Sequence, residues 1–270
     1  MGYSWYNKIR WVGFKMYGAI IGDLAGSIYE YEQISGIRKV RVGKIIPDNA
    51  FYSDDTILTI AIMDAIINKG DYQEYLRKYI REYSLYKPDF SPYFKTSFSP
   101  GVIKWAKGDI EGLSIGNGAM MRISPVGYLF DSEEDVIKNA RLATIPTHNS
   151  KEAVDCATKI ALIIFYLRKG LMLDKIYQIL DINIKYEPFK KFNVTCDETI
   201  GNCLYALYVA NGFEDAIRKA ISYGGDTDTN ACCVGSMAEA MYGINDKLIQ
   251  EANRKIPEEF KKILVRTKYR

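Results

Sequence analysis

The stretch "ISYGGDTDTNA", residues 221–231, places the carboxylates of Asp226 and Asp228 one residue apart, behind two glycines and at the start of an apolar run. Two carboxylates this close raise each other's pKa unless positive charge lies between them. One such residue is explained by a helix start, because Asp, Thr and Asn accept hydrogen bonds from the free N–H groups of a first turn. The remaining oxygens require another explanation.

A second acidic cluster, "FYSDDTILT" at 51–59, precedes the nearly all-apolar segment 57–67. Two ionised carboxylates buried without a counter-charge cost several kcal/mol each. Lys and Arg are missing from residues 49–68 and again between Lys219 and Lys247. The pattern therefore favours a cation shared by the two clusters, and oxygen ligands favour Mg²⁺ or Mn²⁺ over zinc. Helix capping with ordinary solvation is the alternative.

Two glycine-rich stretches stand apart from the acidic clusters. In "GAIIGDLAGSIYE", 18–30, glycines recur every four residues, and we expect them to let two helices pack closely. In "SIGNGAMMRISPVG", 114–127, Gly116, Asn117 and Gly118 form a loop whose backbone N–H groups could approach a phosphate or ribose without obstruction by Cβ atoms.

Helical periodicity dominates the rest of the chain. We predict that Gly70 ends the helix over 57–67, that Asn149 and Glu152 form a capping box, and that Asp197 is an N-cap. Only "KVRVGKII", 39–46, alternates like a strand. The sequence predicts a single, mostly α-helical domain, with further helices over 72–83, 134–143, 153–167, 173–182, 198–211, 214–222, 231–242 and 246–265, the last interrupted at Pro257.

Composition excludes several classes of protein. The 270 residues carry 48% apolar and 26% charged residues, which is ordinary for a soluble globular chain. A net charge of +3 without clustered bases argues against nucleic acid as a partner. The longest apolar run, 160–167, is far short of the roughly 20 residues that span a bilayer, so we expect no membrane partner. Five cysteines without a CxxC motif favour a reduced, cytoplasmic chain.

Two short stretches match known motifs only in part. "DTDTNA" begins like an EF-hand loop, but the sixth position is Ala231 and the twelfth is Met237 instead of Gly and Glu. "GLSIG", 112–116, matches a hydrolase nucleophile elbow but lacks the buried strand that must precede the serine.

Taken together, the motifs resemble the ADP-ribosylglycohydrolase family, which includes dinitrogenase reductase-activating glycohydrolases and ADP-ribosyl-arginine and ADP-ribosyl-serine hydrolases. The resemblance runs from Met16 to Gly243 through "GAIIGDLAGSIYE", "YSDDTILTIA", "GNGAMMRISPVG", "THNSKEAVDCA" and "GGDTDTNACCVGSMAEAMYG". It implies an all-α fold, a single orthogonal helical bundle with a binuclear metal centre at the bottom of a cleft. Residues 16–270 would form this domain, and residues 1–15 an N-terminal extension without an assigned role.

The resemblance also implies roles for individual residues. Two divalent cations, Mg²⁺ or Mn²⁺, would be held by two ligand groups, with Asp228 as the bridge: Ser53, Asp54 and Asp55, then Asp226, Asp228 and Thr229. Glu30 matches a glutamate that approaches the metals, and proton transfer falls to Glu30, Asp54 or Asp55. Expected substrate-binding residues are Gly116, Asn117, Gly118, Met120, His148 and Phe98. For His148, a purely structural histidine is the alternative.

The implied activity is metal-dependent hydrolysis of the glycosidic bond between the distal ribose of ADP-ribose and an acceptor. The segment "DFSPYFKTSFSPGVIKWAKG", 89–108, covers the region in which relatives often carry Gly-Tyr-Gly. Here it reads Ser-Phe-Ser-Pro at 97–100, so the acceptor stays open: arginine, serine, a nucleic-acid end or a small ester. Partners are thus an ADP-ribosylated protein or small ADP-ribosyl compound. Two alternatives are a catalytically silent ADP-ribose-binding or structural relative and a two-metal hydrolase of another nucleotide-like substrate.

Overall fold

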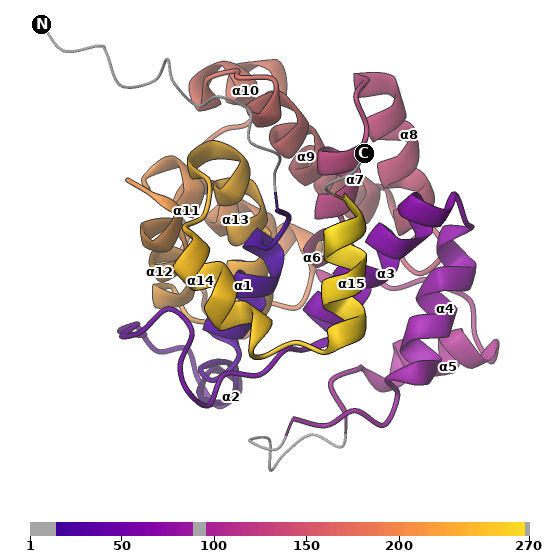
Figure 1. Cartoon of the computed structure of the whole chain (residues 1–270). Coiled ribbons are helices and arrows are strands. Elements are labelled where there is room, and N and C mark those ends of the chain that lie inside the picture. The colour runs from indigo at the N-terminus through magenta and orange to yellow at the C-terminus, as the bar shows by residue number, and fades with distance from the viewer. Residues whose placement is uncertain (1–14, 89–95, 268–270) are drawn as a thin grey trace, which may run out of the picture.

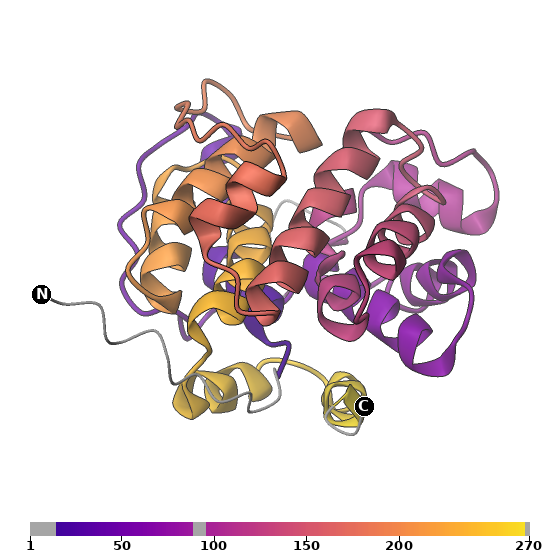
Figure 2. The same cartoon turned by 90° about the horizontal axis from the view of Figure 1, so that it is seen from above.

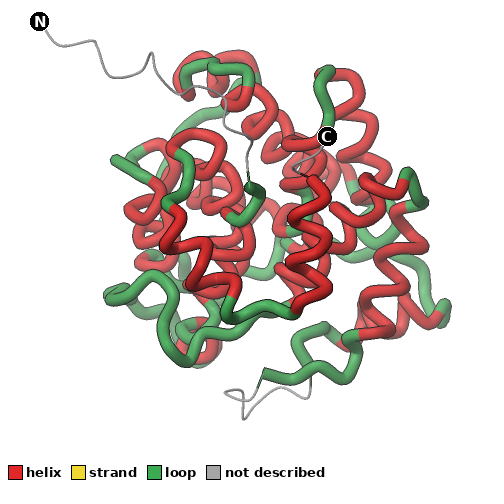
Figure 3. The backbone as a smooth tube through the Cα atoms, in the orientation of Figure 1, coloured by secondary structure: helices red, strands yellow, loops and turns green. Residues whose placement is uncertain are grey.

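The computed structural model describes residues 15–88 and 96–267, and this part of the chain contains helices and loops but no strand (Figure 3). The predicted all-α class is confirmed. The predicted extension over 1–15 lies, except for Lys15, outside the described residues. The helices are Gly18–Gly26 (α1), Glu30–Ile34 (α2), Asp54–Asn68 (α3), Tyr72–Glu82 (α4), Pro100–Lys107 (α5), Gly118–Met121 (α6), Ser124–Leu129 (α7), Glu133–Thr144 (α8), Lys151–Arg168 (α9), Leu173–Ile179 (α10), Cys196–Tyr208 (α11), Phe213–Ser222 (α12), Thr227–Tyr242 (α13), Asp246–Asn253 (α14) and Glu258–Arg266 (α15).

Helices α1 and α13 pack against each other in the interior, although more than 200 residues of chain separate them (Figures 1 and 2). Every residue of α1 is buried. A Cβ atom added to Gly22 would lie 2.0 Å from the carbonyl oxygen of Ala231, and one on Gly18 would lie 2.2 Å from that of Gly235. Real Cβ atoms do not approach backbone this closely, so only glycine fits. The predicted close packing at these glycines is confirmed.

A buried carboxylate fixes the start of α1 on the far end of α13. Glu239 accepts hydrogen bonds from the backbone N–H groups of Lys15, Met16 and Gly18, at 3.0, 2.8 and 2.6 Å. These N–H groups precede or open the helix and have no intrahelical acceptor of their own. Glu239 therefore sets the position of α1 along α13.

Helix α3 begins where the second acidic cluster lies. Ser53 is its N-cap and accepts a hydrogen bond from the Asp55 N–H. The helix extends to Asn68, and Lys69, with φ of 54°, takes the left-handed conformation that was predicted for Gly70. Twelve of its fifteen residues are buried, from Asp55 to Ile66, as the all-apolar sequence predicts.

Several local predictions need correction. Ser150 and not Asn149 caps α9, accepting from the Ala153 N–H, so the predicted capping box with Glu152 is wrong. The capping box lies instead at α11, where Thr195 and Glu198 exchange hydrogen bonds and Asp197 is only a first-turn residue. Residues 39–46 form no strand. The predicted interruption at Pro257 is confirmed, since this residue separates α14 from α15.

The sequence also predicts that no segment spans a membrane. Among the described residues, none of the helices combines the length and apolar character that a membrane crossing demands.

Candidate metal centre and substrate cleft

A cavity of about 640 Å³ lies where the N-termini of α2, α3 and α13 meet the loop before α6. This volume suits a ligand of nucleotide size. Most predicted site residues line it: Glu30, Ser53, Asp54, Asp55, Gly116, Asn117, Gly118, His148, Asp226, Asp228 and Thr229. Met120 and Phe98 are buried in the core and do not line this cavity; the neighbouring Met121 does.

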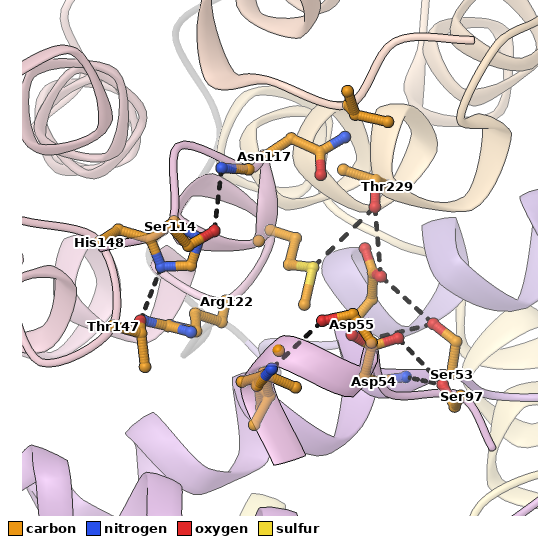
Figure 4. Close-up of a pocket in the computed structure, with 18 of the residues that line it drawn as sticks. Ser53, Asp54, Asp55, Ser97, Ser114, Asn117, Arg122, Thr147, His148 and Thr229 are labelled. Atoms are coloured by element: carbon orange, nitrogen blue, oxygen red, sulfur yellow. Dashed lines mark hydrogen bonds between the residues drawn. The ribbon is translucent and has the colours of Figure 1, made fainter. Parts of the chain in front are cut away.

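The first ligand group lies at the start of α3 (Figure 4). Asp55 Oδ2 accepts hydrogen bonds from the hydroxyls of Ser53, at 3.2 Å, and of Thr229, at 3.3 Å. Because Thr229 belongs to α13, this carboxylate joins the two acidic clusters across 174 residues of sequence. The two acidic clusters that are far apart in the sequence therefore lie side by side in the structure.

Asp23, on α1, forms hydrogen bonds with the first turn of α3, next to the acidic clusters. Its Oδ2 accepts hydrogen bonds from the backbone N–H groups of Ser53, at 2.9 Å, and Thr56, at 3.1 Å, and from the Thr56 hydroxyl. The sequence alone assigns no role to Asp23. Its position fixes the first turn of α3 on the buried helix α1.

The second ligand group is shaped by the two glycines that precede it. Gly224 and Gly225 both have φ of +75°, a conformation that other residues rarely adopt. A Cβ on Gly225 would lie 2.1 Å from the Asn193 side-chain oxygen, which accepts the Asp226 N–H at 2.8 Å. The glycines therefore permit the tight entry into α13 that the sequence predicts. Asn193 is a site-building residue that sequence reasoning missed.

Ligand atoms of Glu30, Asp226 and Asp228 all lie within 4.8 Å of one another, a grouping that could hold a metal ion. Within residues 15–88 and 96–267, two further carboxylate oxygens, Asp23 Oδ1 and Asp55 Oδ1, are buried without a hydrogen-bond partner. Buried polar atoms are nearly always paired, so unpaired carboxylate oxygens beside an acidic cluster suit a cation. The donor set is all oxygen, which fits a hard divalent ion.

The electrostatics of the centre agree with this fit. Burial raises the pKa of Asp226 to about 7, and the charge of Glu30 adds to the rise. Burial likewise raises the pKa of Asp54 to about 7, although the Ser97 hydroxyl opposes it. Burial and the charge of Asp228 raise the pKa of Asp55 and of Glu30 well above their usual range. Positive charge among them would reverse these shifts.

One base reaches this cavity from outside both acidic clusters. Arg122 is 1% exposed, lines the cavity, and lowers the pKa of Asp54 by its charge. Arg122 lies far in sequence from both acidic clusters, so the segments around those clusters give no indication of it. In Figure 4 the α3 carboxylates lie on one side of the cavity, and Arg122 lies on the other with Thr147 and His148.

The loop at Gly116–Gly118 is held more firmly than predicted. The Gly116 N–H donates to the Ser114 hydroxyl at 3.1 Å, and the Asn117 N–H donates to the Val194 carbonyl at 2.9 Å. These two N–H groups therefore serve the loop and not a ligand, which corrects the expectation for them. The Asn117 side chain donates to Asp226 Oδ2 at 2.7 Å, so it orients a metal-ligand candidate.

A second wall of the cavity, across from the Gly116–Gly118 loop, contains part of the segment for which the resemblance predicts contact with the acceptor. Ser97 and Ser99 line the cavity, while Phe98 between them is 3% exposed and packs in the core. Apolar side chains complete this wall: Phe51, Pro88, Val102, Trp105 and Ile110. Residues 89–95, part of the same predicted acceptor segment, lie outside the described residues.

Comparisons with known proteins agree with the motifs. A family model described as ADP-ribosylglycohydrolase matches residues 15–268. The chain is similar to ADP-ribosylhydrolase ARH3 of Homo sapiens, at 24% identity over 84% of each chain. It is also similar to ADP-ribosylarginine hydrolase Tri1 of Serratia proteamaculans, at 23% identity over 87% of this chain and 74% of that protein. A solved "ADP-ribosylglycohydrolase-related protein complex" shares the fold, with a TM-score of 0.69 at 19% identity, covering 95% of this chain and 96% of that one.

Proposed function

This chain belongs to the ADP-ribosylglycohydrolase family, and from that premise we propose that it is a metal-dependent hydrolase that cleaves the bond between the distal ribose of ADP-ribose and an acceptor, releasing ADP-ribose. One observation carries the proposal. Carboxylates from α3 and α13, joined through the Thr229–Asp55 hydrogen bond, converge with Glu30 on the wall of a nucleotide-sized cavity.

The proposed cofactors are two divalent cations, Mg²⁺ or Mn²⁺. Their ligands would come from the two groups already described: Ser53, Asp54 and Asp55 at the start of α3, and Asp226, Asp228 and Thr229 at the start of α13. Such cations, when bound, would coordinate the cis hydroxyls of a ribose and lower the pKa of a nearby water.

The chain's own residues provide the remaining chemistry. Cleavage of a glycosidic bond passes through an oxocarbenium-like state, whose positive charge the surrounding carboxylates stabilise. Glu30 is half-buried at the edge of the acidic group, where burial and the charge of Asp228 raise its pKa. We assign proton transfer to Glu30 or to one of Asp54 and Asp55.

The other end of the cavity suits the rest of the substrate. The loop around Gly116 and Gly118 offers a surface without side chains, and the neutral ring of His148 lies beside it. The diphosphate and distal ribose of ADP-ribose would lie along this loop, while the wall with Ser97 and Trp105 would face the acceptor.

Incubation with ADP-ribosylated arginine and serine peptides, with and without Mg²⁺ or Mn²⁺, tests the proposal. Free ADP-ribose that appears only with metal is the expected result, and the peptide that reacts identifies the acceptor. Binding of ADP-ribose without turnover of either peptide or of a small ADP-ribosyl ester would point to a silent relative. Release of inorganic phosphate would point to a two-metal hydrolase of another substrate.

A further inference from the structure

A buried chain of hydrogen bonds leads from Arg122 to His148, the only histidine in the sequence. Arg122 donates from its Nη2 to the Ala143 carbonyl at 3.3 Å and to the Thr147 hydroxyl oxygen. The same Thr147 hydroxyl lies 2.6 Å from Nδ1 of His148. All three side chains are at most 5% exposed.

The donor and acceptor in each of these hydrogen bonds can be assigned by counting the available hydrogens. A guanidinium can only donate, so the Thr147 oxygen accepts from Arg122 and the single hydroxyl hydrogen must go elsewhere. Within the described part of the chain, the Thr147 hydroxyl has one other partner, His148 Nδ1. If Nδ1 carried a proton, the buried hydroxyl hydrogen would have no acceptor, at a cost of about 1–3 kcal/mol. Nδ1 is therefore the acceptor.

We propose that Arg122 and Thr147 are positioning residues that hold His148 as its Nε2–H tautomer, so that the ring presents one N–H donor to a substrate oxygen. Identification of that oxygen as part of a diphosphate or ribose rests on the proposed function. The tautomer itself rests only on the hydrogen-bond chain.

The surroundings of Nε2 agree with a donor that faces the cavity. A Cβ added to Gly116 or Gly118 would lie 3.7 Å from Nε2, so the two glycines leave the ring edge open. The backbone fixes the ring from behind, because Leu113 and His148 form an isolated bridge and the Ser114 N–H donates to the Thr147 carbonyl at 3.0 Å. Burial and the charge of Arg122 lower the pKa of His148 to about 3, which keeps the ring neutral.

Nitrogen NMR of the full chain, labelled at histidine, tests the tautomer directly, because a single imidazole gives an unambiguous spectrum. The expected spectrum shows a protonated Nε2 and an unprotonated Nδ1. A protonated Nδ1 in the unmodified protein would overturn the proposal. This measurement requires neither substrate nor metal, so it stands even if the proposed activity fails.

Variants of the hydroxyl test the relay. Thr147→Val removes the hydroxyl at nearly constant volume, and we expect mixed tautomers together with a rise in KM of about tenfold at little change in kcat. Thr147→Ser keeps the hydroxyl and should restore the single tautomer. Thr144→Val is the matched control, because the Thr144 hydroxyl is also buried but has no hydrogen-bond partner among the residues that the structure describes. A Thr147→Val protein with an unchanged spectrum and unchanged KM would refute the relay.

Discussion

The hydroxyl of Ser97 lies 2.9 Å from Asp54 Oδ1 and donates a hydrogen bond to it. The same oxygen of Ser97 accepts from the Asp54 backbone N–H. Ser97 therefore fixes both the start of α3 and the direction of one metal-ligand candidate. It also links the wall that departs from the family pattern to the acidic centre.

Replacement of Ser97 should weaken the metal centre without unfolding the protein. Partners that orient metal ligands typically contribute about 10–100-fold in metal affinity or activity, so we expect a loss of that size in Ser97→Ala. Titration calorimetry with Mn²⁺ measures the affinity without any substrate. Ser97→Thr retains the hydroxyl and is the control. Equal Mn²⁺ affinity in the alanine and threonine variants would contradict this role.

Alanine at Asp55 or Asp228 should abolish hydrolysis and leave the helical circular dichroism signal intact. Both carboxylates crowd into one acidic group, so their removal relieves repulsion in the folded protein while it deletes ligands. Asp174→Ala, at an exposed position in the first turn of α10, is the control for loss of one negative charge. Substantial ADP-ribose release by either site variant would show that the ligand assignment is wrong.

The metal-free protein should lose stability as pH rises. Burial raises the folded-state pKa of Asp23 to about 6 and of Asp226 to about 7, above the value of 3.8 for an unperturbed group. The folded state then binds protons more tightly than the unfolded state, so this stabilisation is complete below about pH 4 and disappears as pH passes through about 7. Urea unfolding in EDTA should show a decrease on the order of a few kcal/mol.

Addition of Mg²⁺ should counteract that decrease most strongly at high pH, because cation and protons compete for the same oxygens. Metal binding near pH 6 should also release protons and be weaker than near pH 8. A free energy of unfolding in EDTA that rises between about pH 6.5 and 8 would contradict the electrostatic description of this site, because the lowered pKa of His148 adds a rise with pH only below that window.

Two glycine-to-alanine changes in helices should have opposite effects. Gly22→Ala places a Cβ 2.0 Å from the Ala231 carbonyl oxygen, so α1 must move away from α13 and we expect a loss above about 3 kcal/mol or failure to fold. Gly201→Ala, on an exposed position of α11 with nothing within 4 Å, should stabilise by about 0.5–1 kcal/mol. Thermal denaturation followed by circular dichroism distinguishes them, and equal melting temperatures would refute the close-packing argument.

Much of the fold could be predicted because strong local signals agree with the tertiary structure. The apolar runs at 57–67 and 153–167 became buried helices, and the four-residue glycine spacing indicated close helix packing. Helix ends were predicted less well. Ser150 and Thr195 replaced Asn149 and Asp197 as caps, because several adjacent polar residues could each fill the position and only backbone geometry selects one.

The site was predictable where residues of one chemistry cluster in sequence, as in the two acidic groups. The parts of the site that come from residues distant in sequence were not predictable. Arg122 and Asn193 reach the cavity or its ligands through tertiary packing, and neither carries a local signal of that contact. The choice between Met120 and Met121 depends on which face of the short helix α6 turns toward the cavity, a matter of one residue.

Because α1 and α13 are packed backbone to backbone, the acidic side of the cavity tolerates less sequence change than the side that faces it. Oxygens that would bind cations are fixed by backbone touching backbone at Gly18 and Gly22 and by Asp23 at the first turn of α3. The facing wall is built by α5 and the segment before it, and the Ser97 hydroxyl connects it to the acidic side chains. Descendants of such a chain can acquire new acceptors by changes in that segment, while the arrangement of the acidic side chains stays the same.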